Sequence, residues 1–194
     1  PEGYARNPEL VINFYNERRK QLLEVRPNDG HLGLAELEAD FNVTVVTQNI
    51  DNLHERAGSR RIIHLHGELT KVCSSRDPYN PHYIKELKPD EYEVKFGDKA
   101  GDGTQLRPFI VWFGEPVPEI ETAVNYVEKA DIFVIIGTSM NVYPAAGLLN
   151  YVPREAEVYL IDPKPVDVHS MRRIHVIQKG ASEGVRELRS LLQP

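Results

Sequence analysis

Apolar and polar positions follow two rhythms along the chain. Six short apolar runs rich in β-branched residues favour buried strands; they cover residues 43–47, 62–65, 109–113, 132–136, 158–161 and 174–177. Helical spacing of apolar residues separates several of these runs, at residues 33–39, 120–129, 145–151 and 183–192. Because strands that alternate with helices are typical of an α/β fold, the pattern predicts a mostly parallel sheet.

The segment from residue 68 to residue 105 breaks this alternation. It is polar, rich in Pro, Gly, Asp and Tyr, and has no strong periodicity. We interpret it as a small inserted module and not as a linker.

A helix is predicted at the start of the chain, over residues 8–25. At 100° per residue its apolar side chains share an arc of about 140°, formed by Leu10, Val11, Phe14, Tyr15 and Leu22. Arg18 falls near the middle of this arc. It either pairs with a structural carboxylate or extends along the surface on its apolar stem, or it joins Tyr15, three residues away on the same face, in binding an acidic ligand.

Composition and charge narrow the class of protein. The chain has 194 residues, of which 41% are hydrophobic and 27% charged, values that exclude a disordered, collagen-like or coiled-coil chain and fit one core with an inserted module. Its 23 basic and 29 acidic residues give a net charge of −6, which argues against a general nucleic-acid binder. A single cysteine, Cys73, cannot form an internal disulfide, and no apolar stretch approaches the roughly 20 residues needed to span a bilayer. We therefore expect a reducing, aqueous compartment.

Polar residues follow the first predicted strand. Gln48, Asn49 and Asp51 come where open α/β sheets bind ligands, and they could bind amides, hydroxyls or a ribose. The same residue types are also ordinary in a capped turn that leads into a helix.

The second predicted strand ends in two histidines and a glycine. Alternation along a strand places His64 and His66 on the same face, and Gly67 allows another group to approach the backbone closely. A histidine at a strand end can act as a general base near neutral pH, or it can be structural. No third ligand stands at a recognisable metal-binding spacing, so we predict no metal site here.

A nucleotide site is suggested further along the chain. The strand at residues 132–136 leads into Gly137, Thr138 and Ser139, and Asp162 follows the next strand, 25 positions after the glycine. This spacing fits a ribose contact by Asp162. The full glycine-rich fingerprint is absent, and a turn of another α/β protein can look similar.

These motifs, in this order, resemble those of the sirtuin family, the NAD-dependent protein lysine deacylases. The likeness extends over essentially the whole chain and is carried by TQNIDNLHERAG at 47–58, HG at 66–67, RP at 107–108, VWFGE at 111–115, GTS at 137–139 and VYPAA at 142–146. It implies a Rossmann-type NAD-binding domain formed by residues 28–67 and 107–194, and a small module formed by residues 1–27 and 68–106.

The resemblance also implies roles for individual residues. His66 becomes the catalytic base. Nicotinamide and its ribose are assigned to Gln48, Asn49 and Asp51, and the remainder of the NAD site to Gly137, Thr138, Ser139, Asp162 and Ala181. The substrate backbone is expected to pair as an extended strand with Val111, Trp112, Phe113, Gly114 and Glu115. The implied products are free lysine, nicotinamide and O-acyl-ADP-ribose.

The opening helix gains a specific meaning from this family. Tyr15 and Arg18 resemble the Tyr-x-x-Arg pair of the sirtuin class that removes succinyl, malonyl or glutaryl groups from lysine. Acylated-lysine proteins are therefore the expected partners, with a desuccinylase or demalonylase activity beside some deacetylase activity. The alternatives are mono-ADP-ribosyl transfer, which some relatives perform, and a non-catalytic module that binds NAD or acyl-lysine.

Two family features are missing from the chain. Sirtuins usually hold a structural zinc with four cysteines, and here only Cys73 stands in that region, so we predict no structural zinc. The glycine-rich loop that usually opens the family's NAD site does not occur either, and we expect that a preceding portion of the protein carries it. The resemblance to bacterial members predicts a cytoplasmic location, with a mature mitochondrial form as the alternative.

Overall fold

The structure, a computed structural model, describes residues 1–137, 145–166 and 172–193. The chain divides into two compact units. The first unit comprises Pro1–Arg26, Thr47–Asn52 and His64–Pro118, and the second comprises Pro27–Val46, Leu53–Ile63 and Glu119–Pro194.

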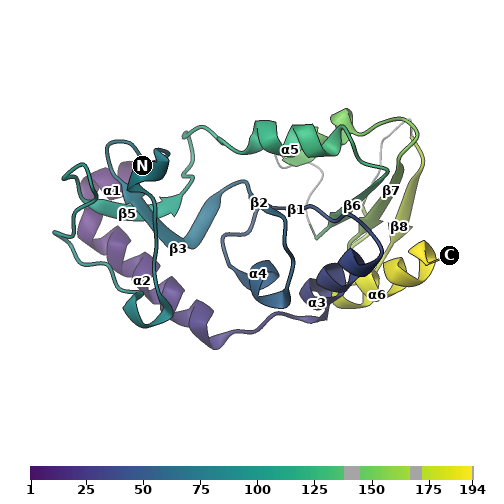
Figure 1. Cartoon of the computed structure of the whole chain (residues 1–194), viewed down its shortest axis with the longest axis horizontal. Coiled ribbons are helices and arrows are strands. Elements are labelled where there is room, and N and C mark those ends of the chain that lie inside the picture. Colours follow the sequence, from purple (N-terminus) through teal and green to yellow (C-terminus); the bar gives the residue numbers. More distant parts are fainter. Residues whose placement is uncertain (138–144, 167–171, 194) are drawn as a thin grey trace. The chain divides into compact units, whose positions relative to one another are not determined.

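The first unit is built on an antiparallel sheet of three strands in the order β4-β3-β5, of which Figure 1 labels β3 and β5. Its elements are α1 (Glu2–Arg6), α2 (Pro8–Glu24), β3 (Gly67–Ser74), η2 (Pro81–Tyr83), β4 (Lys85–Glu86), η3 (Pro89–Glu91) and β5 (Leu106–Ile110), where η denotes a 3-10 helix. The predicted strand at 109–113 is therefore shifted toward the N-terminus, and it pairs antiparallel with β3. This pairing also explains why the division of the chain differs from the expected domain boundaries, since it holds residues 64–67 and 107–118 with the small module.

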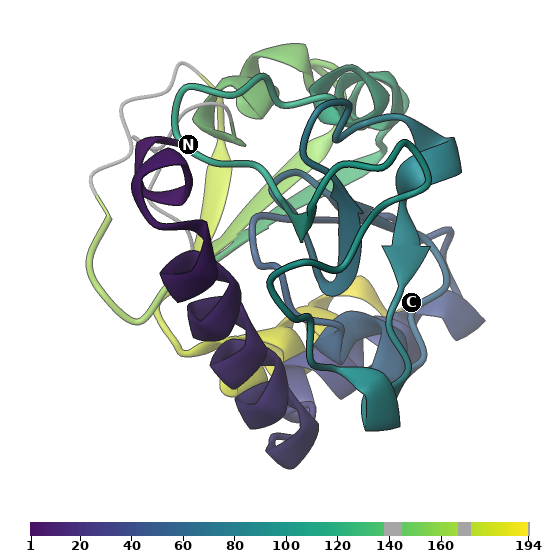
Figure 2. The same cartoon turned by 90° about the vertical axis from the view of Figure 1, so that its left-hand side faces the viewer.

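Helix α2 begins where the sequence predicts. The Asn7 side chain accepts a hydrogen bond from the backbone N–H of Leu10 (3.1 Å), and Pro8 occupies the first turn, where its missing N–H costs nothing. Figure 2 shows that α1 and α2 meet at an angle around Asn7. Helix α2 packs against β3 and β5, and its Ile12 forms a core with Val72 and Val94.

The buried face of α2 differs from the predicted apolar arc. Leu10 and Phe14 are 64% and 56% exposed, and Arg18 is exposed as well. The buried cation of this helix is its neighbour Arg19, 3% exposed. The prediction was wrong because the sheet meets the side of the helix that carries Ile12, and the helical period alone does not show which side has a partner.

Arg19 fixes α2 to the rest of the first unit. Its guanidinium donates to the carbonyl of Tyr92 (Nε, 2.8 Å), to that of Leu69 (Nη1, 3.3 Å) and to the side-chain oxygen of Asn16 (Nη2, 2.7 Å). Asn16 in turn exchanges hydrogen bonds with the backbone of Val94. Burial lowers the pKa of Arg19 to about 10, so the cation persists at neutral pH and holds the helix that carries Tyr15 and Arg18.

A hydrogen-bonded cluster joins the end of β3 to the loop before β5. The carboxylate of Asp102 accepts hydrogen bonds from the hydroxyls of Ser74 and Thr104 and from the Thr104 N–H. The Ser74 hydroxyl oxygen accepts the backbone N–H groups of Arg76 and Asp77. Together these hydrogen bonds form a polar staple, made of Ser74, Asp102 and Thr104, that holds the module.

We expect Asp102→Asn to lower the melting temperature at neutral pH, because the amide is a poorer acceptor for the two hydroxyls. The hydrogen bonds from Ser74 and Thr104 lower the pKa of Asp102 from 3.8 to about 2. A carboxyl whose pKa is depressed in the folded state stabilises the fold above its unfolded pKa, and the contribution disappears as the pH falls through the folded pKa. The difference in melting temperature between wild type and variant should therefore shrink between pH 4 and pH 2. Asp90→Asn, an exposed change in the same unit, is the control, and equal melting temperatures of Asp102→Asn and wild type at pH 7 would contradict the staple.

Cys73 lies in the interior of this module. Its side chain is fully buried, and burial raises the pKa of the thiol to about 12. Metal ligation requires the thiolate, so this environment does not favour a metal ligand. The absence of structural zinc stays a prediction, which elemental analysis of chelator-treated protein checks.

The second unit contains a parallel sheet of three strands in the order β6-β7-β8. Its elements are α3 (Asp29–Glu36), η1 (Leu37–Ala39), α4 (Leu53–Ala57), α5 (Ile120–Val127), β6 (Ile132–Ile136), η4 (Ala145–Tyr151), β7 (Glu157–Ile161), β8 (Ile174–Ile177) and α6 (Ala181–Leu192). The predicted α/β class with a parallel sheet is confirmed. The helix predicted at 145–151 is a 3-10 helix, and the one predicted from residue 33 begins earlier, since Asn28 and His31 form a capping box.

Close packing holds α3 and α6 together over one face of this sheet. A Cβ atom on Gly33 would lie 2.7 Å from Val185, and one on Gly184 would lie 2.2 Å from Ile161, so both contacts require glycine. The core consists of side chains from these helices and strands: Leu37, Tyr159, Ile161, Ile177, Val185 and Leu188. Strands β1 (Val45–Thr47) and β2 (Ile62–His64) pair with each other. The last residue of each strand is assigned to the first unit and the other two residues to the second. In the described parts of the chain, every helix is too short or too polar to cross a membrane.

Candidate active site

Hydrogen bonds to the backbone of the turn after β1 hold it in place. The N–H of Asn49 donates to the Thr47 hydroxyl (3.0 Å), and the carbonyl of Ile50 accepts the N–H of Leu69 (2.8 Å). The carbonyl of Asn49 accepts a hydrogen bond from Nδ1 of His64 (3.2 Å). These bonds fix the segment that carries Gln48, Asn49 and Asp51, and they leave the Asn49 side chain exposed.

His66 lies outside the strand in which the sequence placed it. Strand β2 ends at His64, which is buried, and His66 is half-buried in the turn before β3. The expectation that both histidines share one strand face was wrong, because the chain turns at Leu65 and His66 to begin the antiparallel sheet. Gly67 explains how this turn fits: its φ is +88°, and a Cβ there would lie 2.1 Å from the carbonyl oxygen of Phe109.

The His66 side chain is available for chemistry. Its backbone carbonyl accepts the N–H of Val111 (2.9 Å), but its imidazole makes no hydrogen bond to any of the described residues. Burial lowers the pKa of His66 below its usual 6.5, so the ring is neutral at pH 7 and can accept a proton.

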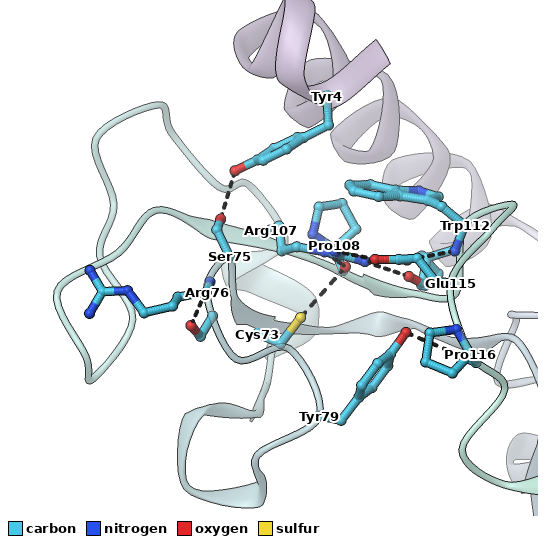
Figure 3. Close-up of polar contacts among 12 residues, drawn as sticks. Tyr4, Cys73, Ser75, Arg76, Tyr79, Arg107, Pro108, Trp112, Glu115 and Pro116 are labelled. Carbon is cyan, nitrogen blue, oxygen red and sulfur yellow. Dashed lines mark hydrogen bonds and ion pairs between the residues drawn. The ribbon is translucent and has the colours of Figure 1, made fainter. Parts of the chain in front are cut away.

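The segment after β5 forms a turn supported by an ion pair. Arg107, 5% exposed, donates through Nη1 and Nη2 to the two carboxylate oxygens of Glu115 (2.9 and 3.0 Å), and Nη2 also donates to the Ile110 carbonyl (2.7 Å) (Figure 3). Glu115 Oε1 accepts the N–H of Trp112 as well (2.8 Å). Gly114 closes the turn with φ of +86°, a conformation that favours glycine.

This geometry changes the part that the predicted substrate-binding residues can play. Both oxygens of Glu115 are engaged within the protein, so its carboxylate shapes the turn, and the pairing of the substrate with the backbone of residues 111–115 stays a prediction. Phe113 is fully exposed at the tip, and Val111 leads from the end of β5 into the turn. Strand β5 ends at Ile110, and none of the residues 111–115 belongs to it.

Tyr15 and Arg18 lie on α2 in the same unit as His66. The Tyr15 hydroxyl accepts a hydrogen bond from the indole nitrogen of Trp112 (3.0 Å). Arg18 lies over the ring of Phe14, with 5.8 Å from its guanidinium carbon to the ring centroid, and it forms no ion pair with any of the described residues. The first unit therefore brings His66, the turn after β5 and the Tyr15–Arg18 pair into one connected structure.

In the second unit, two of the predicted NAD residues, Gly137 and Asp162, directly follow the carboxyl ends of parallel strands. The N–H of Gly137, after β6, donates to the Ile161 carbonyl (3.0 Å), and the N–H of Asp162, after β7, donates to the Ile177 carbonyl (3.2 Å). Ala181 begins the helix that follows β8. The predicted contacts Thr138 and Ser139 lie outside the described residues.

These strand ends suit a nucleotide. Gly137 has φ of +58°, and a Cβ built there would meet no atom of the described residues within 4 Å, so these residues leave its backbone open to close approach. Asp162 accepts the N–H of Lys164 through Oδ1 (2.9 Å), and in the described chain Oδ2 has no hydrogen bond. Since open α/β sheets bind ligands at the carboxyl ends of their strands, the residues present fit the adenosine part of NAD.

The sequence analysis did not identify two residues that support the turn after β5, Arg107 and Tyr4. The ion pair of Arg107 could have been anticipated, because a cation and a carboxylate, Arg107 and Glu115, lie eight positions apart on either side of the predicted apolar strand. Tyr4, whose ring packs against Trp112 with centroids 5.3 Å apart, gave no signal in the sequence.

Comparisons with known proteins agree with this arrangement. A Sir2 family model matches residues 1–144. A protein of Bacteroides thetaiotaomicron named NAD-dependent protein deacylase is 84% identical over 194 residues, which are 100% of this chain and 83% of that protein. A protein of the same name from Helicobacter pylori is 47% identical over 97% of this chain and 80% of its own length.

Solved structures give the same result. The structure of a Sir2 homologue in complex with NAD has a TM-score of 0.81 at 34% sequence identity, over 100% of this chain and 77% of that one. A Sir2 complex with a p53 peptide and NAD has a TM-score of 0.77 at 27% identity, over 98% of this chain and 80% of that one. The chain belongs to the Sir2 family.

Proposed function

We propose that this chain forms most of an NAD-dependent protein lysine deacylase that prefers acyl groups ending in a carboxylate, such as succinyl and malonyl. The general activity is supported by family membership and by the relatives named NAD-dependent protein deacylase. The preference rests on one observation: an exposed arginine and a tyrosine hydroxyl, one helical turn apart, lie in the same unit as the candidate base His66.

His66 acts as the general base. Bound NAD supplies a nicotinamide leaving group and a ribose that accepts the acyl group. The neutral imidazole of His66 would accept the proton of a ribose hydroxyl when NAD is bound, and its lowered pKa keeps the ring in the required neutral form at pH 7. The substrate chain pairs with the backbone at Val111, whose own N–H binds the His66 carbonyl.

Arg18 and Tyr15 recognise the acidic end of the acyl group. The alternative role for Arg18 was an ion pair with a carboxylate of the protein. In the described parts of the chain, no carboxylate pairs with Arg18. A guanidinium and a phenol hydroxyl together can bind a carboxylate, and a hydrogen bond to a charged group contributes about 1.5–3 kcal/mol. This corresponds to roughly a 10- to 100-fold difference in selectivity.

The proposed preference is tested with two peptides of identical sequence, one succinylated and one acetylated on the same lysine. The full-length wild-type protein is expected to give a kcat/KM for the succinyl peptide about 10- to 100-fold above that for the acetyl peptide. Arg18→Met removes the charge and should narrow or reverse this ratio. Lys20→Met removes an exposed charge from the opposite face of the same helix and should leave the ratio unchanged. Equal values for both peptides in the wild type would refute the preference.

The reaction products separate deacylation from ADP-ribosyl transfer. Mass spectrometry after incubation with NAD and the succinyl peptide is expected to detect O-succinyl-ADP-ribose. ADP-ribose attached to protein, with the succinyl group still on lysine, would contradict the proposed function.

A further inference from the structure

The indole of Trp112 is held on both faces. The guanidinium carbon of Arg107 lies 3.8 Å from the centroid of the indole ring, and the ring of Tyr4 packs against the indole with an interplanar angle of 36°. Figure 3 shows Trp112 between these two side chains. A cation over an indole face is a favourable contact, more so when it is desolvated as Arg107 is.

The same ion pair also fixes the backbone of Trp112. Glu115 binds Arg107 through both oxygens and accepts the N–H of Trp112 through Oε1. Arg107 is further anchored by the Ile110 carbonyl. The ring plane of Trp112 and the start of its side chain are therefore set by one buried group, which determines where the indole N–H points.

That N–H points at the hydroxyl of Tyr15. The distance from Trp112 Nε1 to the Tyr15 oxygen is 3.0 Å. An indole N–H can only donate, so the Tyr15 oxygen is the acceptor in this bond. With one acceptor position of its oxygen occupied, the Tyr15 hydroxyl must direct its own proton elsewhere, where it can be donated to a ligand.

We propose that Trp112 is a specificity-determining positioning residue: its indole N–H orients the Tyr15 hydroxyl as a hydrogen-bond donor toward the carboxylate of an acidic acyl group. This inference rests on the proposed function. It assigns to Trp112 a role in selecting the acyl group, beyond its place in the segment that was expected to bind the substrate backbone. An acetyl group has no carboxylate to accept this proton. Removal of an acetyl group from lysine therefore does not depend on the orientation of the Tyr15 hydroxyl.

The test is a double-mutant cycle in the full-length protein. Trp112→Phe keeps an aromatic ring between Tyr4 and Arg107 but removes the N–H. It is expected to lower the ratio of succinyl to acetyl kcat/KM about 3- to 10-fold, through KM, as the loss of about one hydrogen bond does. Tyr15→Phe should lower the ratio at least as much. The double variant should match Tyr15→Phe alone, since Trp112 acts through the hydroxyl that this variant lacks.

Two results overturn the inference. If Trp112→Phe lowers turnover of both peptides equally, Trp112 has only a structural role. If it lowers the ratio as strongly in the Tyr15→Phe background as in the wild type, it does not act through Tyr15. Failure of the proposed function is distinct, because it shows as a ratio near one in the wild type before any substitution.

A measurement on the wild-type side chain covers the case in which Trp112→Phe does not fold. Trp112 is the single tryptophan of this chain, so its indole N–H resonance can be followed by NMR. The resonance is expected to move in Tyr15→Phe, and to move in the wild type on binding of the succinyl peptide more than of the acetyl peptide. An unchanged resonance in Tyr15→Phe would show that the hydrogen bond is absent in solution.

Discussion

Replacing His66 with alanine is expected to lower kcat/KM for deacylation about 10²- to 10⁴-fold, the usual contribution of a general base. The imidazole is half-buried, neutral at pH 7 and makes no hydrogen bond to the described residues, so its protein environment offers no structural reason for a histidine. The measurement is the rate of nicotinamide release with an acyl-lysine peptide and NAD.

The fold should survive this change. His66 is tied to Val111 through its backbone carbonyl, which alanine retains, so the melting temperature should stay close to that of the wild type. His82→Ala removes an exposed imidazole from the same unit and is the matched control for activity. A His66→Ala protein that is folded and fully active would end the assignment of His66 as the base.

The pH dependence of kcat/KM is a second test of His66 as the general base. Burial lowers the pKa of His66 below 6.5, and the neutral form is the one that accepts a proton. As the pH falls, activity should therefore persist until the pH passes below 6.5, and the acidic limb of kcat/KM should report this lowered pKa. An acidic limb with its midpoint above 6.5 would contradict the assignment.

Glu115→Gln is expected to destabilise the first unit by about 3 kcal/mol, the lower end of the range for breaking a buried ion pair. The variant leaves the Arg107 guanidinium buried without its counter-charge. We take the lower end because the Glu115 side chain is 17% exposed, so water can reach the vacated position. The measurement is the free energy of unfolding in urea.

A surface ion pair is the matched control. Lys179 and Glu187 in the second unit lie 2.8 Å apart with side chains 48% and 40% exposed. Glu187→Gln should cost less than about 1 kcal/mol, since exposed pairs contribute little. Similar losses in the two variants would show that the Arg107–Glu115 pair is no more important to stability than a surface contact.

The stability difference due to Glu115 should depend on pH. Burial by itself raises the pKa of Glu115, but the hydrogen bonds from Arg107 and the Trp112 N–H, together with the charge of Arg107, outweigh burial and hold the pKa below 4.5. The stabilisation is thus fully present above pH 4.5 and is lost as the pH falls through the lower folded value. The gap between wild type and Glu115→Gln should close on acidification.

Elements with a strong local pattern were predicted well. Strands β6 and β8 lie at the predicted residues, because a short run rich in β-branched side chains suits a buried parallel strand wherever its partners are. The residues at the ends of β6 and β7, Gly137 and Asp162, were predicted for the same reason: the position of a residue at a strand end follows directly from the strand.

Elements whose environment comes from distant residues were not predicted. The helical period predicted the length of α2, but the burial of Arg19 and not Arg18 depends on the carbonyls of Leu69 and Tyr92, which lie 50 and 73 positions away from Arg19. Strand β5 has an apolar pattern that suits either sheet direction, and only its pairing with β3 makes it antiparallel.

By itself the sequence determined the α/β class and the strands of the parallel sheet, since these depend on periodicity along the chain, and the resemblance of its motifs to those of sirtuins pointed to His66 as the candidate base. Tertiary structure alone decided which arginine of α2 is buried, that the Glu115 carboxylate binds Arg107, and that the Trp112 indole reaches Tyr15. The physical reason is that a hydrogen bond or an ion pair needs atoms within about 3 Å, and residues 97 positions apart acquire that distance only through packing.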